Sequence, residues 1–419
     1  MKYTETTIPE FITGGRKVDT DLELYTYIEG KGISTGADLF ESEVDGEIKT
    51  VFQQFFRENN KCADNISFFI LSEFHYPSHS GVEIILKKIN ERLNVGKKVT
   101  VFIITGQEPR PIDCSYFFNA IINETKVKPY NIFYNSSIID SRNYENKGAN
   151  ILTSPLSGTY FVFHGSEEFK TKITNFDFNI VNKTKLFNHF TRRVNLSRWV
   201  SAAVLHSSFN RDEFNMSLGV DNEIKDAELE FYNRLSTAAG ADFYFKDKIP
   251  IVYDRDYVDS KKNEQYMHPD SNNTSALFDI VHETNGSNVN MSILTRVFND
   301  FYYCSEKSFR PFTLCSIPIY MNSAGFINWF SNQYQLDTFD DILPNKLLDR
   351  ENDYFKKTAI VNDFLLDFKK NNSDYNEVFK SLRPRLEYNM RRLPELFRKA
   401  RIEKFNNVME SVYKVLNGE

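Results

Sequence analysis

The sequence is poor in cysteine, with four cysteines in 419 residues and no CxxC pair among them. Structural zinc sites and thioredoxin-type redox centres are built on such pairs, so the sequence predicts neither. It has no run of about 18 apolar residues, the length a transmembrane helix needs. Its first residues lack the apolar core of a signal peptide. We therefore expect a soluble protein in the cytoplasm that has no membrane partner.

The sequence also lacks a strong excess of positive charge. Its 51 lysines and arginines stand against 57 aspartates and glutamates, giving a formal net charge of −6. This balance argues against a polycation that wraps nucleic acid along its whole surface. One local exception is segment 381–404, where eight lysines and arginines meet three glutamates. Such a segment is either a solvated helical face or a contact surface for an anionic acceptor such as DNA.

Aromatic residues are plentiful, with 38 Phe and 22 Tyr, and 41% of the chain is hydrophobic. This composition excludes disorder as the main state and allows a large core. At 419 residues the chain is long enough for about two or three domains.

The first half shows strand and helix patterns in alternation. Residues 66–72 (ISFFILS) form a short apolar run typical of a buried strand, and 82–94 carry an apolar stripe with helical spacing. Gly96 is suited to end that helix, and 97–106 read as a second strand. A strand, a helix and a strand within about 40 residues predict a βαβ unit with a parallel sheet. Further strands are expected at 130–134 and 159–163.

The second half repeats this alternation and ends in a helical tail. The expected strands are 185–190, 249–253, 276–284 and 316–321, and the expected helices are 197–209, with Ser197 as its N-cap, and 323–332. Residues 301–315 read as a strand, a tight turn and a helix. Helical patterns return from about 349, where Pro384 and Pro394 are expected to kink or divide the tail. We place a domain boundary in the weakly patterned stretch 165–184.

Polar clusters follow the predicted strands at three turns: 191–198, 283–288 and 304–310. Open α/β sheets bind ligands at the carboxyl ends of their strands, which directs attention to these turns. The first holds Arg192, Arg193 and Arg198, and guanidinium groups next to a helix start suit phosphate. The third turn places Glu306 beside Lys307. The Glu306 carboxylate can accept hydrogen bonds from ribose hydroxyls, and the Lys307 ammonium can neutralise a diphosphate. The pattern predicts a nucleoside diphosphate site, although surface ion pairs and an ordinary serine-capped helix start explain each turn taken alone.

The segment CSEKSFRPFTLCSIPIYMNSAGFINWFSNQYQLDTFDDI (304–342) resembles a motif of glycosyltransferases from phages, large DNA viruses and bacteria. Their pattern is a Thr/Ser-Glu-Lys-Thr/Ser-Phe-x-Pro turn, a helix, a strand and a second helix that leads to Gly-Phe-x-Thr-Phe-Asp-Asp. Weaker similarity covers 276–284 and 188–205, where Thr191 and Ser197 replace the Asn and the His of the family's pattern. The likeness spans roughly 185–365, and the N-terminal 160 residues match no family.

This resemblance implies an α/β fold of the GT-B type, with two Rossmann-like domains. Residues 1–170 would bind the acceptor and 185–348 a nucleotide-sugar donor, with 349–419 as a helical tail that packs back on the first domain. In the family's fucosyltransferase-like members the Ser-Glu-Lys turn contacts the donor. The donor-binding residues implied here are Arg192, Arg193, Arg198, Glu283, Thr284, Ser305, Glu306 and Lys307. A UDP-sugar is favoured over a GDP-sugar, and no metal or other cofactor is expected.

Glycosyl transfer by inversion also requires a base beside the acceptor hydroxyl. The turn after the first strong strand offers Glu73 and His75, and either a catalytic or a structural role fits them. The loop from Thr105 to Arg110, near Asp113, and the cluster 164–167 are further candidates for the acceptor side. We interpret Asp340-Asp341 as a helix N-terminal cap and Asp254-Arg255-Asp256 as a surface ion pair rather than as metal sites.

The sequence therefore predicts a hexosyl- or pentosyltransferase that moves a sugar from a nucleoside diphosphate to an acceptor hydroxyl. The phage and viral members suggest a hydroxymethylated base in DNA as acceptor, reached through the basic segment 381–404 in a host cytoplasm; a glycan is the other acceptor considered. The alternative is a nucleic-acid-binding protein that has the fold without catalysis, with its Tyr and Phe stacking on bases.

Overall fold

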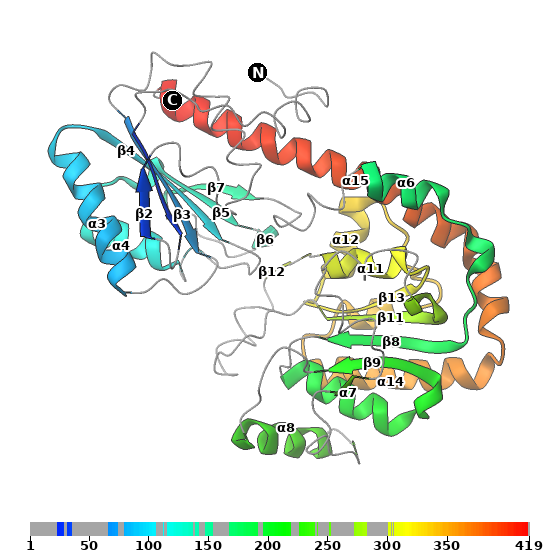
Figure 1. The fold of residues 1–419 in the computed structure, drawn as a ribbon. Coiled ribbons are helices and arrows are strands. Elements are labelled where there is room, and N and C mark those ends of the chain that lie inside the picture. Colours follow the sequence, from blue (N-terminus) through cyan, green and yellow to red (C-terminus); the bar gives the residue numbers. More distant parts are fainter. Residues whose placement is uncertain are drawn as a thin grey trace. The chain divides into compact units, whose positions relative to one another are not determined.

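The computed structural model describes part of the chain, and for some of that part the backbone alone. The described residues are 23–28, 32–35, 66–73, 79–105, 112, 115–136, 139–141, 147–153, 167–191, 196–218, 226–238, 241, 251–252, 272–282, 301–302, 304 and 306–417. The chain divides into two compact units, residues 1–162 together with 397–419, and residues 163–396. Each unit is described by itself below (Figure 1).

The first unit is built on a sheet with the strand order β2-β1-β3-β4-β5-β7. Its strands are β1 (Glu23–Ile28), β2 (Gly32–Thr35), β3 (Ile66–Glu73), β4 (Lys98–Thr105), β5 (Ile132–Ser136) and β7 (Asn150–Thr153). All neighbours pair in parallel except β2, which runs antiparallel to β1. The short strand β6 (Ile139–Ser141) follows β5 in the chain.

Two helices cover one face of this sheet, α3 (His79–Asn94) and α4 (Tyr116–Glu124). The predicted apolar stripe of α3 is the buried side, because Ile85 and Ile89 are fully buried in the core. Gly96 ends the turn after α3 with a φ of 81°, which glycine adopts without steric cost. Together α3 and the parallel pair β3–β4 confirm the predicted βαβ unit.

The parallel strands of the first sheet, β1, β3, β4, β5 and β7, follow one another across it in chain order, while the antiparallel β2 lies at the edge beyond β1. The crossovers between the parallel strands therefore move in one direction, and right-handed crossovers in one direction place their helices on the same face. The contact between α3 and α4 on that face agrees with this. Among these parallel strands the order shows no reversal.

The second unit has a sheet with the order β10-β9-β8-β11-β13. Its strands are β8 (Lys185–Thr191), β9 (Phe214–Leu218), β10 (Ile251–Val252), β11 (Ala276–His282) and β13 (Ile317–Met321). All pair in parallel except β10, which lies antiparallel at the edge. The chain moves outward from β8 to β9 and then returns to place β11 on the other side of β8. The strand order thus reverses between β8 and β11.

Helices cover both faces of this sheet, giving three layers (Figure 1). On one face lie α7 (Leu196–Ser208) and α14 (Tyr354–Asn371), and the Phe278 ring of β11 packs edge-on against Phe368 of α14 at 4.8 Å. On the other face lie α11 (Glu306–Thr313) and α12 (Phe326–Tyr334), where the Tyr320 ring of β13 meets Phe330 at 5.2 Å. The second unit therefore has a doubly wound sheet, with its switch in strand order between β8 and β11.

The remaining elements extend or connect these layers. They are the helices α6 (Glu167–Asn175), α8 (Asp226–Ala238), α13 (Asn345–Leu348) and α15 (Tyr375–Asn417), the strand β12 (Phe301–Tyr302), and the 3-10 turns η3 (Pro129–Asn131), η4 (Phe178–Ile180), η5 (Arg211–Glu213) and η7 (Asn272–Ser275). Among the described residues no helix is long and apolar enough to span a membrane.

The starts of three strands in the second sheet meet at one buried lysine. Lys183 donates from Nζ to the carbonyl oxygens of Thr274 at 2.6 Å, Ala276 at 2.7 Å and Leu314 at 3.2 Å. Burial lowers the pKa of this amine to about 7. Lys183 therefore ties the amino ends of the strands together, at the edge opposite to the one where parallel sheets bind ligands.

The predicted mixed α/β class with parallel sheets is confirmed. One boundary expectation is wrong, because Ser197 is the second residue of α7 instead of its N-cap. The prolines do not divide α15, which runs as one helix through both Pro384 and Pro394, and the expected kink stays a prediction. The strand expected at 159–163 lies outside the described residues.

Candidate functional site

The reversal of strand order between β8 and β11 marks the place where α/β sheets bind ligands. At such a point the two flanking crossovers leave the sheet on opposite faces, which opens a crevice beyond the carboxyl ends of the strands. In the second unit those ends are Thr191 of β8 and His282 of β11. We call this position the switch-point edge.

All three predicted polar turns belong to this edge by topology. The first turn joins the end of β8 to α7, and the second follows the end of β11. The third begins α11, which runs back along the sheet to the start of β13, so its first turn lies at the carboxyl edge. Tyr320, one residue before the end of β13, donates from its hydroxyl to the Ser308 carbonyl at 2.8 Å, which fixes the first turn of α11 there.

Two of the predicted donor-binding side chains are described. Arg198, in the first turn of α7, is half-buried and donates from Nη2 to the His282 carbonyl oxygen at 3.3 Å. Since α7 follows β8 in the chain, this contact links the β8 side of the switch-point edge to the end of β11. Lys307 is the second residue of α11 and is also half-buried.

The other predicted site residues are described in backbone only or not at all. Glu73 is the last residue of β3, where it pairs with Thr105 at the end of β4, and Glu306 is the first residue of α11. Outside the described residues lie Arg192, Arg193, Glu283, Thr284, Ser305 and His75, and the segments 106–111, 163–166 and 254–256. The convergence of Arg193 with Lys307 therefore stays a prediction.

Two histidines that the sequence analysis did not select meet directly beneath the switch-point edge. The Nε2 atoms of His189 on β8 and His282 on β11 are 2.8 Å apart, and both side chains are buried. The register that pairs Phe278 with Phe187 puts the two histidines on the same face of the sheet. The Tyr354 ring, at the start of α14, lies nearly parallel to the His282 ring with centroids 6.4 Å apart.

Both histidines are held in the neutral form. Burial, followed by the charges of Arg310 and Arg198, lowers the pKa of His189 to about 3. Burial also holds the pKa of His282 well below its usual value, with His189 and Arg198 adding to the effect. Since a neutral imidazole has one N–H and one acceptor nitrogen, one Nε2 donates and the other accepts.

A buried ion pair lies on the opposite face of the same strands. Arg310 of α11 donates from Nε to Asp279 Oδ2 and from Nη2 to Asp279 Oδ1, both at 2.8 Å. Its guanidinium also lies over the Phe190 ring of β8, 5.8 Å from the centroid. Burial raises the pKa of the Asp279 carboxyl, and the bidentate guanidinium opposes that rise. Arg310 thereby fixes α11, and with it Lys307, against the two switch-point strands.

Two helix starts near this edge already hold carboxylates of the chain itself. Asp349 accepts from the backbone N–H groups of Ile327 and Asn328 in the first turn of α12, at 2.8 and 3.2 Å. Asp353 caps α14 by accepting from Phe355 N at 2.8 Å. These caps occupy the positions where an anion would otherwise bind to α12 and α14. The starts of α7 and α11 are the two that flank the switch point.

The sequence contained a signal for the missed residues. Strands buried on both faces are expected to be continuously apolar, yet β8 carries Asn188 and His189, and β11 carries Asp279 and His282, all buried. Arg310 lies inside the Ser-Glu-Lys-Ser-Phe-Arg-Pro turn. Buried polar residues in such strands require partners, but the sequence does not say which residues those partners are.

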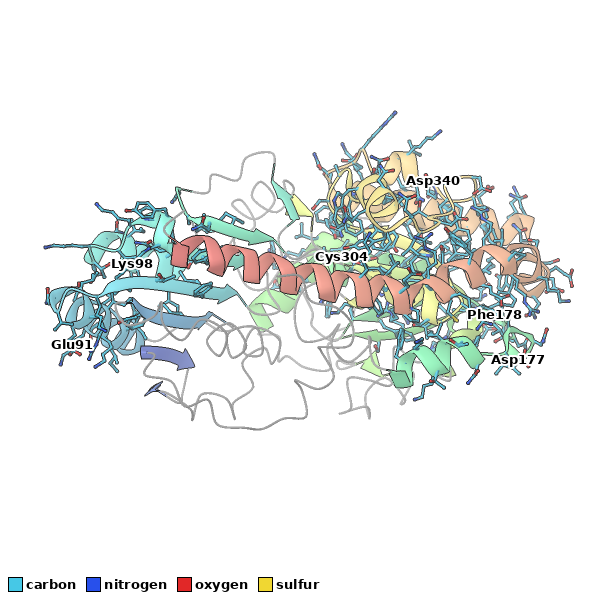
Figure 2. All side chains as sticks on the ribbon, turned by 90° about the horizontal axis from the view of Figure 1, so that it is seen from above. Glu91, Lys98, Asp177, Phe178, Cys304 and Asp340 are labelled. Carbon is cyan, nitrogen blue, oxygen red and sulfur yellow. The ribbon has the colours of Figure 1, made fainter. Side chains whose placement is uncertain are left out.

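Four arginines of the basic segment 381–404, all in the second unit, bind other parts of that unit. Arg383 donates to Asn179 Oδ1 at 2.7 Å, and the guanidinium of Arg391 donates to the Ile173 carbonyl at 2.8 Å. Both guanidiniums lie 5.7 Å from the ring centroid of Phe178, which is labelled beside α15 in Figure 2. These four guanidiniums therefore already have partners within the unit, and binding of DNA through the basic segment stays a prediction.

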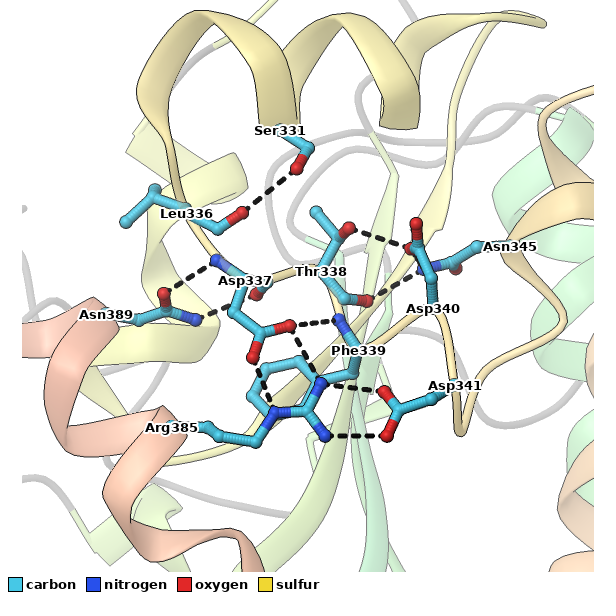
Figure 3. A network of polar contacts seen from close by, with 10 residues as sticks. All are labelled: Ser331, Leu336, Asp337, Thr338, Phe339, Asp340, Asp341, Asn345, Arg385 and Asn389. Atoms are coloured by element: carbon cyan, nitrogen blue, oxygen red, sulfur yellow. Dashed lines mark hydrogen bonds and ion pairs between the residues drawn. The ribbon is translucent and has the colours of Figure 1, made fainter.

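Arg385 organises the loop that carries the acidic pair (Figure 3). It donates from Nη2 to Asp337 Oδ1 at 2.9 Å and to Asp341 Oδ1 at 2.7 Å. Asp340 instead accepts from Thr338 Oγ1 at 2.8 Å. The interpretation of Asp340-Asp341 as a helix cap is wrong, because these carboxylates fold the loop and hold it against α15. No cluster of three or more potential metal ligands occurs among the described side chains.

The chain was also compared with known proteins. No protein-family model, no curated protein and no solved structure matches it.

Proposed function

We propose that this protein is a glycosyltransferase with a GT-B arrangement, whose nucleotide-sugar donor binds at the switch-point edge of the second unit. The observation that carries the proposal is the reversal of strand order between β8 and β11. It brings the starts of α7 and α11, and the cationic side chains in their first turns, to one edge of one sheet. In the first sheet the described parallel strands β1, β3, β4, β5 and β7 follow chain order without such a reversal, so the topology favours the second unit as the donor site.

The chemistry expected at this edge is stabilisation of a leaving diphosphate. Glycosyl transfer passes through an oxocarbenium-like state while negative charge grows on the departing oxygen. Arg198 and Lys307, together with Arg192 and Arg193, would supply fixed positive charge to that oxygen. By analogy with oxyanion-hole donors, one well-placed donor contributes about 3–4 kcal/mol to the barrier reduction.

The remaining roles follow from position. Glu306 would accept from the ribose hydroxyls, and Glu73, at the carboxyl end of β3, is the proposed base toward the acceptor hydroxyl. UDP-sugars are the favoured donors, with GDP-sugars as the alternative. The acceptor is a hydroxyl group of a glycan or of hydroxymethylated DNA.

The proposal is tested by binding and by turnover. UDP or GDP should raise the thermal unfolding temperature of the protein in proportion to its binding. Arg198→Ala and Lys307→Ala should each weaken nucleotide binding about 10- to 100-fold, the loss expected for a hydrogen bond to a charged group. Donor turnover is followed by mass spectrometry with hydroxymethylated DNA and simple glycans offered as acceptors.

Matched controls come from exposed cations of the same unit. Arg234 on α8 and Lys380 on α15 have side chains that are 76% and 67% exposed, and each forms an ion pair with a glutamate on its own helix. Arg234→Ala and Lys380→Ala should bind the nucleotide as the wild type does. If Arg198→Ala and Lys307→Ala behave like these controls, the donor site is elsewhere. A protein that responds to DNA but to no nucleotide would be a nucleic-acid-binding protein.

A further inference from the structure

The His189–His282 pair is unusual in its surroundings. Each histidine uses Nε2 for the other, at 2.8 Å. Each also has a buried Nδ1 atom to which the described residues offer no hydrogen-bond partner. A buried polar atom without a partner costs free energy, so such atoms in a native protein call for an explanation.

These atoms gather at the carboxyl ends of the strands that flank the switch point. His282 is the last residue of β11, and His189 lies two residues before the end of β8. The His282 carbonyl also receives the Arg198 guanidinium, so the pair lies directly below the proposed donor site. The described starts of the same strands are satisfied differently, since Lys183 binds three carbonyl oxygens there.

The charged side chains around the pair are either positive or already neutralised in an ion pair. Arg198 of α7 and Arg310 of α11 are the cations that act on His189. Asp279 of β11 is bound bidentately by Arg310, and Tyr354 of α14 contributes a neutral ring. A proton added to the pair would therefore be repelled by the nearby arginines. An anion bound at the same edge reverses this effect, because its negative charge favours the protonated pair.

We propose that the His189–His282 pair takes up one proton when a diphosphate-bearing ligand binds at the switch-point edge. The inference rests on the proposed function, since it uses the same edge. The pair then carries three N–H groups in place of two, because the added proton binds the free Nδ1 of the histidine that donates from Nε2, and the ligand's negative charge compensates it. Because linkage is reciprocal, acid then strengthens ligand binding.

The experiment measures the protons bound with UDP at pH 6.0, by titration calorimetry in two buffers of different ionisation enthalpy. UDP itself changes protonation near this pH, so the result is compared with the double variant His189→Phe/His282→Leu. This variant removes both partners at once and leaves neither polar group buried alone. The wild type should take up close to one proton more than the double variant. Its affinity relative to that variant should rise by up to tenfold per pH unit as the pH falls from 7 to 5.5.

His206 provides the matched control. It lies later on α7, half-buried against the Phe214 ring at 5.8 Å, at the start of β9 and away from the carboxyl ends of the strands. His206→Gln should take up protons as the wild type does. Equal proton uptake in the wild type and the double variant overturns the inference while leaving the donor site intact. Complete lack of UDP binding overturns both proposals.

A second measurement covers the case in which the double variant does not fold. Histidine ring nitrogens labelled with ¹⁵N report directly whether an imidazole is neutral or charged. At pH 6.0 the wild-type signals of the pair should be neutral without UDP and move to the charged form at saturation. Ring signals that stay neutral with UDP bound overturn the inference.

Discussion

Arg310 joins elements from both sides of the switch point through one guanidinium. It binds Asp279 of β11 bidentately and lies over Phe190 of β8, and its side chain is only 2% exposed. Replacing both members of a buried pair by apolar residues is often tolerated, whereas removing one leaves a buried charge without compensation. Arg310 is thus a positioning residue for Lys307, which lies one turn earlier on α11.

We predict that Arg310→Met lowers the free energy of unfolding by about 3–5 kcal/mol. The double variant Arg310→Met/Asp279→Leu should lose clearly less. Both tryptophans, Trp199 and Trp329, lie in the second unit, so urea unfolding followed by their fluorescence reports on this unit. Arg234→Ala, on an exposed pair, should cost less than about 1 kcal/mol. A double variant as unstable as Arg310→Met would contradict this account.

At the residue scale the sequence indicated the cations of the site better than its buried polar groups. Arg198 and Lys307 were predicted because a cation next to a helix start has a recognisable pattern. His189 and His282 were not predicted, since their significance depends on the pairing of β8 with β11, which are 93 positions apart at these residues. Strand pairing over such a separation is a property of the tertiary fold.

Among the elements, α15 shows how distant contacts override a local signal. A proline inside a helix removes one hydrogen bond and costs about 3 kcal/mol or more. The helix nevertheless runs through Pro384 and Pro394. Arg385 and Asn389 lie between these prolines and bind Asp337, at its carboxylate and at its backbone. The sequence shows the prolines plainly but does not show these compensating partners.

We predict that Arg385→Met destabilises the second unit by about 1–2 kcal/mol. The side chain is 31% exposed, so solvent screening limits the effect of its ion pairs with Asp337 and Asp341. Amide exchange at Phe339, whose N–H is bound by Asp337, should become faster in this variant. Lys380→Ala on the same helix should change neither quantity. Unchanged exchange at Phe339 would show that Arg385 does not hold the loop.

The sequence likewise predicted some of the helices and strands and missed others. The sequence predicted β3, α3, β4, β8, β11 and β13 with boundaries within a few residues, because each has a largely apolar run or stripe. The elements it missed include β1, β2, α4, β6, β7, α6, β9 and α8. In α6 the sequence EEFKTKITN has few apolar residues, and its helix depends on Phe169 and Ile173 being buried. Short elements of this kind form where tertiary contacts select them.

At the scale of the whole molecule, the two units differ in topology. The parallel strands described in the first sheet follow chain order, and the strand order of the second sheet reverses between β8 and β11. Hydropathy patterns predicted parallel sheets in both halves but contain no information about strand order. The sequence therefore located the candidate turns, and the strand order was needed to show that they belong to one edge.

We predict that UDP protects the second unit selectively in hydrogen exchange followed by mass spectrometry. Peptides that contain the ends of β8 and β11 and the start of α11 should exchange more slowly with the nucleotide bound, since binding stabilises the structure around it. Peptides from β3 and β4 should be unaffected by the nucleotide alone. Protection confined to β3 and β4 would move the donor site to the first unit.

Lys183 places a titratable amine among backbone carbonyl oxygens from two chain segments. Because the amine is tethered to the chain, it is present at this end of the sheet whenever the sheet forms, and it is fully charged only below its pKa of about 7. The exchange of potassium for sodium in the solvent should consequently leave this end of the sheet unchanged.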